Sequence, residues 1–260
     1  MSFTRALRGQ GLALGAQMAR EIHVATGYGG HKLLIGILEP IVGVGVAIYW
    51  HTLLKADPPY GTSRVLYISS GLFCTYVFIH VSSEFRSLAK GAGADRRFPA
   101  VNTIDFVLAA AAMKSIFYGF VGFLGFAYIY YEYTSQAAPT NWHDIIAGFA
   151  ALVMFGLGIG LCNASLERLW PVWRYIWAPI ARAQILFSGV LYCPSLLRSD
   201  IRDILSWNPV LHASEIFRMG FYPMYPKVIY DGRYLWTCIF IVLLLGLALD
   251  RGLRRRLARG

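Results

Sequence analysis

The sequence predicts an all-α, polytopic membrane protein with six transmembrane helices. Of its 260 residues, 57% are hydrophobic and 15% are charged, whereas charged residues make up about 25% of a soluble domain. Runs of about 20 apolar residues recur along the chain, and this is the length that a helix needs to cross a membrane. The net charge of +10 comes mostly from Lys and Arg in the gaps between these runs. We therefore attribute the charge to membrane topology, and we expect no nucleic-acid partner.

The six apolar runs define the predicted spans. They cover residues 33–54, 65–81, 104–130, 145–163, 172–193 and 234–249. The hydrocarbon core offers no water to bond the backbone, so each run should form a helix.

The positions of Lys and Arg predict the orientation. Fifteen of them lie before the first span, after the second, after the fourth (with Arg174 at the start of the fifth included) and in the tail after residue 249. The gap after the third span has none, and the gap after the first has only Lys55 and Arg64. Because positive residues stay on the cytoplasmic side, both termini should be cytoplasmic.

Two cytoplasmic segments have amphipathic patterns. Residues 1–32 predict an interfacial helix, with Phe3 and Leu7 on its apolar side and Arg5 and Arg8 able to reach lipid headgroups. Residues 33–260 form the transmembrane domain, and its longest cytoplasmic loop, 82–102, contains a helical pattern. The residues of interest in this loop are Glu84, Phe85, Arg86, Leu88 and Lys90.

A segment before the last span predicts a re-entrant helical hairpin at 195–226. Asn208 followed by Pro209 is typical of an N-cap and a first helical position, and Gly220 is typical of the residue just past a helix end. A helix over 209–219 would be roughly 16 Å long at about 1.5 Å per residue, about half the hydrocarbon thickness. One face of this helix would carry Val210, Ala213, Ser214 and Phe217, and another His212, Glu215 and Arg218, with Glu215 and Arg218 spaced as an i,i+3 pair. A shorter helix opened by Ser199 or Asp200 would precede it. The alternative is an amphipathic helix lying flat on the outer leaflet.

Polar residues along the spans are candidates for function. Arg182 and Gln184 lie in the fifth span, where Arg182 is either a pore-lining cation or a residue that snorkels to the inner leaflet. Glu39 and Pro40 lie in the first span, where Pro40 should kink the helix and Glu39 should pair with a neighbouring helix. Lys114 in the third span is a candidate ion-pair partner for Glu39.

Aromatic residues gather at the inner start of the fifth span, where Trp173 and Trp177 are found. They predict either an interfacial belt or a platform on which sugar rings stack.

Several ordered motifs give the chain a resemblance to a known family. They are REI at 20–22, LEP at 38–40, RRFPAVNTIDFVLA at 96–109 and WNPVLHASEIFRMGFYPMY at 207–225. With the span count, they resemble the membrane subunit of capsular polysaccharide ABC exporters, within the type-two ABC exporter superfamily. One departure is the segment between REI and LEP, which has Lys32 and two histidines where the family has several basic and aromatic residues.

The resemblance implies an inner-membrane permease that moves lipid-linked, acidic capsular polysaccharide from cytoplasm to periplasm. It implies a homodimer with two ATPase subunits, a periplasmic co-polymerase-type protein and an outer-membrane channel. The chain has no GxxxxGK[ST] stretch, so ATP and Mg should bind the partner ATPase. We expect no catalytic or metal-ligating residue and no cofactor bound by this chain.

The predicted functional residues form three sets. The substrate channel comprises Arg182, Gln184, Glu39, Pro40, Lys114, Trp173 and Trp177. The outer gate comprises Trp207, Asn208, Pro209, His212, Glu215 and Arg218. The ATPase coupling set comprises Glu84, Phe85, Arg86, Leu88 and Lys90.

Two alternatives to capsule export remain at this stage. One is an ABC exporter of O-antigen, teichoic acid or small hydrophobic molecules. The other is a membrane-embedded transferase, although the six histidines are scattered along the chain and not clustered at one membrane face.

Overall fold

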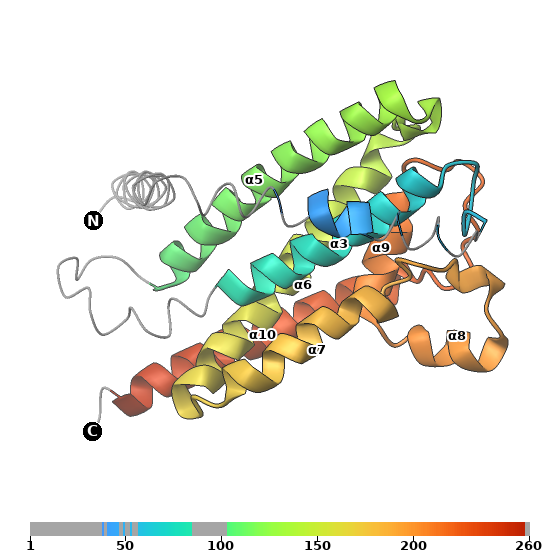
Figure 1. Ribbon diagram of the computed structural model, residues 1–260. Helices are drawn as coiled ribbons and strands as arrows, with labels where there is room; N and C mark the ends of the chain where they lie inside the picture. Colours follow the sequence, from blue (N-terminus) through green and yellow to red (C-terminus); the bar gives the residue numbers. More distant parts are fainter. Residues whose placement is uncertain are drawn as a thin grey trace.

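The computed structural model describes residues 57–84 and 103–257 and, before them, positions 38, 41–46, 49 and 53. Within these residues every regular element is a helix, as the sequence predicts (Figure 1). The N-terminal interfacial helix, Glu39, Pro40 and the coupling residues after Glu84 lie outside the described residues.

Four long helices form the body of the protein. They are α3 (Arg64–Glu84), α5 (Thr103–Glu132), α6 (Trp142–Leu169) and α10 (Gly232–Leu257). In the described part of the chain, these four are long and apolar enough to cross a membrane. The second, third, fourth and sixth predicted spans are therefore confirmed as helices of spanning length. Of the first span, residues 41–46 are helical, and Val44 packs with Ile68 and Leu72 of α3.

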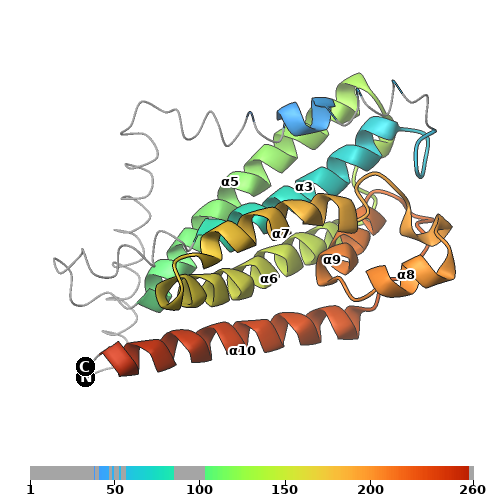
Figure 2. The ribbon, with the colours of Figure 1, turned by 60° about the horizontal axis from the view of Figure 1, so that its bottom comes forward.

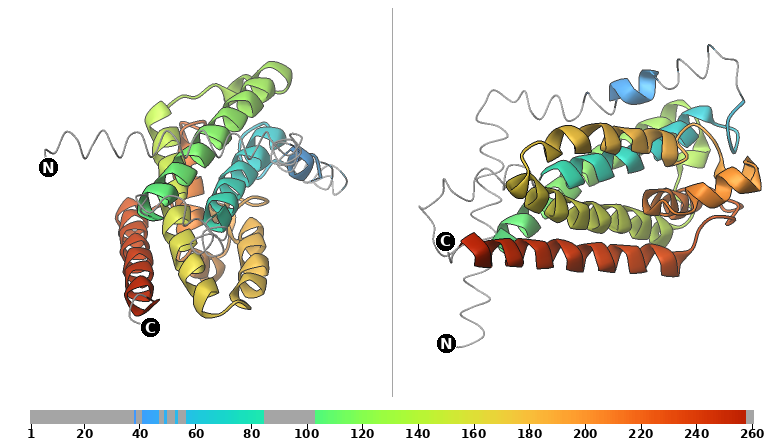
Figure 3. Two further views of the ribbon diagram at one scale, coloured as in Figure 1. Left: turned by 90° about the vertical axis from the view of Figure 1, so that its left-hand side faces the viewer. Right: turned by 90° about the horizontal axis from the view of Figure 1, so that it is seen from below.

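Helix α6 is the centre of the bundle. It packs against α10 and α3 along its length and against α9 near its start (Figure 2; Figure 3, left). Glycines make these approaches close: a Cβ atom at Gly156 would lie 3.0 Å from Cβ of Val81, and one at Gly158 would lie 3.0 Å from the backbone nitrogen of Leu243. Small residues at helix crossings are typical of membrane bundles, where close packing replaces the hydrophobic effect between helices.

The fifth predicted span is shorter than expected. Helix α7 (Trp173–Phe187) has 15 residues, roughly 22 Å at about 1.5 Å per residue, whereas the sequence predicted a helix to Cys193. The chain leaves the helix at Ser188 and turns at Gly189, whose φ of 68° lies in the left-handed region that favours glycine. The prediction of a continuous helix over 172–193 is therefore wrong at its C-terminal end.

Two short helices lie at the end of the bundle where α7 stops (Figure 2). They are α8 (Ser199–Leu205) and α9 (Pro209–Met219). The 3-10 turn η2 (Pro194–Leu196) lies between α7 and α8, and a second one, η1 (Ser135–Ala137), lies between α5 and α6. The prediction of a helix over 209–219 is confirmed, and so is the N-cap, because Asn208 accepts a hydrogen bond from the backbone N–H of Val210.

Gly220 follows α9 for a different reason from the one predicted. Its φ of −69° is not left-handed, so no glycine-only conformation is required. The requirement is space, because a Cβ atom here would lie 2.9 Å from the carbonyl oxygen of Asn141. The Gly220 carbonyl accepts hydrogen bonds from the backbone N–H groups of Thr140 (2.8 Å) and Asn141 (3.0 Å). The end of α9 is thereby joined to the start of α6.

Candidate functional site: the buried helix α9 and its polar network

Helix α9 is enclosed by the rest of the protein. Every residue from Val210 to Met219 is buried, including the polar side of the helix with His212, Glu215 and Arg218. A helix lying flat on a membrane surface would keep these three side chains exposed. The sequence correctly separates an apolar and a polar side of this helix, but both sides contact protein.

Arg218 is the centre of the network and is 0% exposed. Its Nη2 donates to the carbonyl oxygen of Gly189 at 2.8 Å and of Tyr67 at 3.4 Å, and its Nε donates to Oγ of Ser70 at 3.3 Å. Its Cζ lies 3.9 Å from the centroid of the Tyr67 ring, which adds a cation–π contact. One guanidinium group thus joins α9 to α3 and to the turn that follows α7.

Glu215 is the counter-charge of Arg218. Its Oε1 lies 3.8 Å from Nη1 of Arg218, and both side chains are fully buried. The same oxygen accepts a hydrogen bond from the hydroxyl of Tyr225 at 2.7 Å, and the hydroxyl of Tyr67 donates to the carbonyl oxygen of Tyr192 at 2.9 Å. The i,i+3 spacing of the two charges is as predicted. Because the pair is buried, removal of either partner would leave an uncompensated charge inside the protein.

The network explains why the chain can leave its helix after Phe187. The carbonyl groups of Ser188 and Gly189 no longer bond within α7, so they need other donors. Oγ of Ser214 has a single proton, and it lies 3.1 Å from the carbonyl oxygen of Ser188 and 2.8 Å from that of Leu211. Nη2 of Arg218 donates to the carbonyl oxygen of Gly189. Irregular backbone at such a position is tolerated in a membrane protein where protein covers it.

A glycine on α3 makes room for the guanidinium group. A Cβ atom at Gly71 would overlap Nη2 of Arg218 and would lie 2.9 Å from Cα of Val190. The motif Ser70–Gly71 therefore supplies both a hydrogen-bond acceptor and a space. Sequence analysis missed these partners, although a pair of polar and small residues inside an apolar run is the signal that could have identified them.

His212 anchors the other side of α9. Its Nδ1 accepts a hydrogen bond from the backbone N–H of Asp231 at 3.0 Å, and its Nε2 lies 2.7 Å from the carbonyl oxygen of Ser206. Since a carbonyl can only accept, Nε2 must carry the proton and the imidazole is neutral. His212 thereby connects the end of α8 to the start of α10.

Two predicted sets meet at the N-terminus of α9. Nδ2 of Asn208 donates to Oε1 of Gln184 at 2.9 Å and to the carbonyl oxygen of Phe187 at 3.0 Å. Gln184 was predicted in the channel and Asn208 in the gate, and the structure places them in contact. Trp207, which directly precedes Asn208, is 77% exposed.

The remaining channel residues are spread over the bundle. Arg182 is exposed on α7, and Lys114 is half-buried on α5. Trp177 is buried in the core, and the indole N–H of Trp173 donates to Oδ1 of Asn163 at 2.9 Å. Both tryptophans therefore contribute to packing against the bundle. Of the coupling set, Glu84 ends α3 and the other members lie outside the described residues.

Comparison with known proteins gives several relatives. Polysialic acid transport protein KpsM of Escherichia coli is 22% identical over 246 residues, which cover 93% of this chain and 93% of that protein. Capsule polysaccharide export inner-membrane protein CtrC of Neisseria meningitidis is 24% identical over 110 residues, 42% of each chain. Capsule polysaccharide export inner-membrane protein BexB of Haemophilus influenzae is 25% identical over 85 residues, 33% of this chain and 32% of that protein.

No protein-family model matches the chain. The relatives nevertheless confirm the resemblance that the sequence motifs predict, and the match to KpsM extends over nearly the whole length of both proteins.

Proposed function

We propose that the chain is the transmembrane subunit of an ATP-driven exporter that moves lipid-linked, acidic capsular polysaccharide from the cytoplasm to the periplasm. The observation that carries this proposal is the alignment over 93% of the chain with a protein named for polysialic acid transport. The four helices of spanning length support a membrane pathway.

The proposed assembly is a homodimer in the inner membrane with both termini in the cytoplasm. Two ATPase subunits bind ATP and Mg and dock on the loop 82–102. A periplasmic co-polymerase-type protein and an outer-membrane channel continue the path. Each subunit crosses the membrane six times, and the segment 195–226 is a re-entrant hairpin that closes the path on the outer side.

The path follows the first span and α7. Val44 of the first span packs in one cluster with Ile68 of α3, Ile185 of α7 and Val190 of the turn after it, so these elements are neighbours. Arg182 is exposed on α7, where a guanidinium group can hold a phosphate or a sugar carboxylate through two hydrogen bonds as the polymer passes.

The outer gate opens at Asn208 and not at Arg218. Opening at Asn208 breaks two hydrogen bonds of about 0.5–1.5 kcal/mol each, and water replaces both. Withdrawing Arg218 would leave Glu215 buried without its partner, at a cost of about 3–5 kcal/mol. Trp207 and Asn208 are thus the part of the gate that meets the polymer, while Glu215 and Arg218 hold α9 in place.

The proposal is tested by disrupting the gene in its host. Surface polysaccharide should disappear and polymer should accumulate in the cytoplasm. The purified chain should also retain an ATPase subunit. Unchanged surface polysaccharide would overturn capsule export. Loss of polysaccharide synthesis, with no ATPase retained, would favour the membrane-embedded transferase. Assays with defined polymers would separate capsule export from export of O-antigen, teichoic acid or small hydrophobic molecules.

The channel role of Arg182 has its own test. Arg182→Ala should reduce export of an acidic polymer while the protein still assembles, and Arg182→Lys should retain part of the activity because charge remains but the planar fork does not. Normal export by Arg182→Ala would contradict the pore-lining role.

A further inference from the structure

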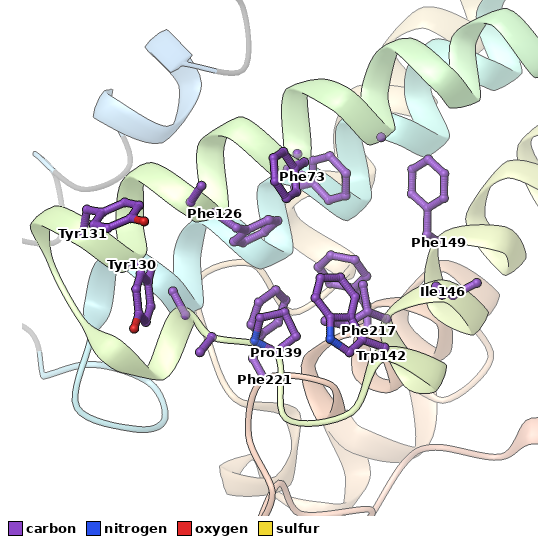
Figure 4. Close-up of a pocket in the computed structure, with 17 residues that line it drawn as sticks. Phe73, Phe126, Tyr130, Tyr131, Pro139, Trp142, Ile146, Phe149, Phe217 and Phe221 are labelled. Atoms are coloured by element: carbon purple, nitrogen blue, oxygen red, sulfur yellow. The ribbon is translucent and has the colours of Figure 1, made fainter.

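A cavity of about 420 Å³ lies between α5 and α6, and neither Glu215 nor Arg218 lines it. Its volume is within the range of about 300–1,000 Å³ found for ligand pockets. Figure 4 shows rings from four parts of the chain around it: Phe73 of α3, Phe126 of α5, Phe217 of α9, and Phe221 just after α9. The lining is almost entirely apolar, so the cavity suits hydrocarbon.

The wall on α5 is hollowed by two glycines, Gly119 and Gly122. A Cβ atom at Gly122 would lie 2.6 Å from the Phe73 ring, so this glycine allows α5 to approach α3. A Cβ atom at Gly119 would meet only Phe149, at 3.9 Å. The space beside Gly119 therefore belongs to the cavity and can be filled by a side chain.

The cavity opens on an exposed apolar surface. Phe123 of α5 and Ile146 of α6 line it and are 63% and 62% exposed. Both helices are long and apolar enough to cross a membrane, so the medium at this opening is hydrocarbon. The occupant with access to the cavity is a lipid chain.

The end of the cavity near the α5–α6 connection carries polar groups. Tyr130, Tyr131 and Trp142 line it there. Glu132 follows Tyr131, and Asp144 lies between Trp142 and Ile145, while no Lys or Arg occurs anywhere from residue 115 to 167. Glu132 and Asp144 are thus neighbours, in the chain, of residues that line this end. The Asp144 carboxylate also accepts a hydrogen bond from Nδ2 of Asn141 at 2.9 Å and lies 3.3 Å from Nδ1 of His143. Carboxylates attract an ammonium group and repel a bare phosphate.

We infer that the cavity holds one acyl chain of a phosphatidylethanolamine molecule, with its ammonium group near Glu132 and Asp144. Such a lipid joins α5 to the rest of the bundle from the side. The inference depends on the proposed function only for the orientation, which places this headgroup in the outer leaflet. The lipid anchor of the transported polymer could also supply a hydrocarbon chain, but its phosphate would be repelled by the two carboxylates.

The inference can be tested on purified protein in vesicles of phosphatidylcholine. The probe is phosphatidylethanolamine that carries a diazirine on one acyl chain, present in small amount. After irradiation, mass spectrometry should find cross-links within residues 119–149. Gly119→Leu, which fills the cavity, should reduce these cross-links several-fold. Gly125→Leu is the matched control, because a Cβ atom there meets nothing within 4 Å and Gly125 does not line the cavity.

Ala127→Leu is a second filling variant, for use if Gly119→Leu fails to fold. Equal cross-linking in wild-type protein and in a folded filling variant would overturn the site.

Competition with unlabelled lipids tests the headgroup. Phosphatidylethanolamine should displace the probe more effectively than phosphatidylglycerol or a polyprenyl phosphate. The double variant Glu132→Gln with Asp144→Asn should remove that preference without removing cross-links. Stronger displacement by the polyprenyl phosphate would contradict the inference and would indicate a site for the transported lipid. Because this readout needs no transport, it can fail while the proposed function stands.

Discussion

Helices α9 and α5 show opposite relations between polarity and burial. Helix α9 carries His212, Glu215 and Arg218, yet every residue from Val210 to Met219 is buried. Helix α5 is strongly apolar, yet Ile116, Phe120, Phe123 and several other large side chains are at least half exposed. In a soluble protein the apolar helix α5 would be buried and the more polar helix α9 would be exposed. In a membrane, lipid is as apolar as the interior, so burial of apolar groups does not select a helix's position.

Polar contacts and close backbone approach therefore hold this bundle together. The hydrogen bonds of Arg218 and the glycine contacts of α6 involve few residues, but each would be costly to disturb. The surface of α5 only has to be as apolar as the hydrocarbon of the bilayer. Substitutions in the two regions should therefore differ strongly in their cost.

Removing the central guanidinium group should have the largest effect. Arg218→Met leaves Glu215 buried and unpaired and should destabilise the protein by about 3–5 kcal/mol, seen as a large fall in Tm in detergent. Arg198→Met is the control, since Arg198 forms an exposed ion pair with Asp200 and should change little. Because Glu215 is the group left unpaired, Arg218→Met with Glu215→Leu should recover part of the lost stability. A Tm for Arg218→Met equal to that of the control would show that the network does not carry stability.

Crowding the contact between α6 and α9 should have an intermediate effect. A Cβ atom at Gly148 would lie 2.8 Å from Cα of Phe217, so Gly148→Ala forces two backbones apart and should cost about 1–3 kcal/mol. Gly125→Ala on α5 meets nothing within 4 Å and serves as the comparison in the same thermal measurement. Equal Tm values for the two variants would argue against the close crossing.

Changing the lipid-facing surface of α5 should have the smallest effect. Phe120 is 61% exposed, and Phe120→Leu exchanges one apolar group for another in contact with hydrocarbon. The expected change is within about 0.5 kcal/mol, measured by unfolding in lipid vesicles. A loss comparable to that of Gly148→Ala would mean that another surface, such as a second subunit, covers this part of α5.

Local rules predicted much of the fold but not the partners of the gate. The start of α9 and its Asn208 cap follow from Asn-Pro, because this signal acts within a few residues, whereas Gly220 at the other end is required by the close approach of Asn141. The end of α7 was missed because its irregular turn is stabilised by Ser214 and Arg218, which lie more than 20 positions away in the chain. By hydropathy, Ser188 to Cys193 belong to an apolar run, because hydropathy depends only on the residues of the segment and not on their contacts.

The roles of the gate residues also depend on contacts between residues that are far apart in the sequence. The spacing of Glu215 and Arg218 correctly predicts a pair, but spacing cannot distinguish a pair offered to a passing polymer from one enclosed by α3 and the turn after α7. The acceptors on α3 and at Gly189 decide that question, and they come from distant parts of the sequence.

Cysteine accessibility can show whether α9 is a buried anchor of a gate that faces the outside. Single cysteines would replace Ile204, Asn208, His212, Ala213 and Met224 in a background without Cys74, Cys162, Cys193 and Cys238. A membrane-impermeant thiol reagent added from outside to intact cells should label positions 204 and 224 quickly, because these side chains are 74% and 87% exposed. Position 208 should label slowly, and faster when ATP opens the exporter, while 212 and 213 should stay protected throughout. Rapid labelling at 212 would mean a surface helix, and labelling of 204 and 224 only from the cytoplasmic side would contradict the orientation and the gate together.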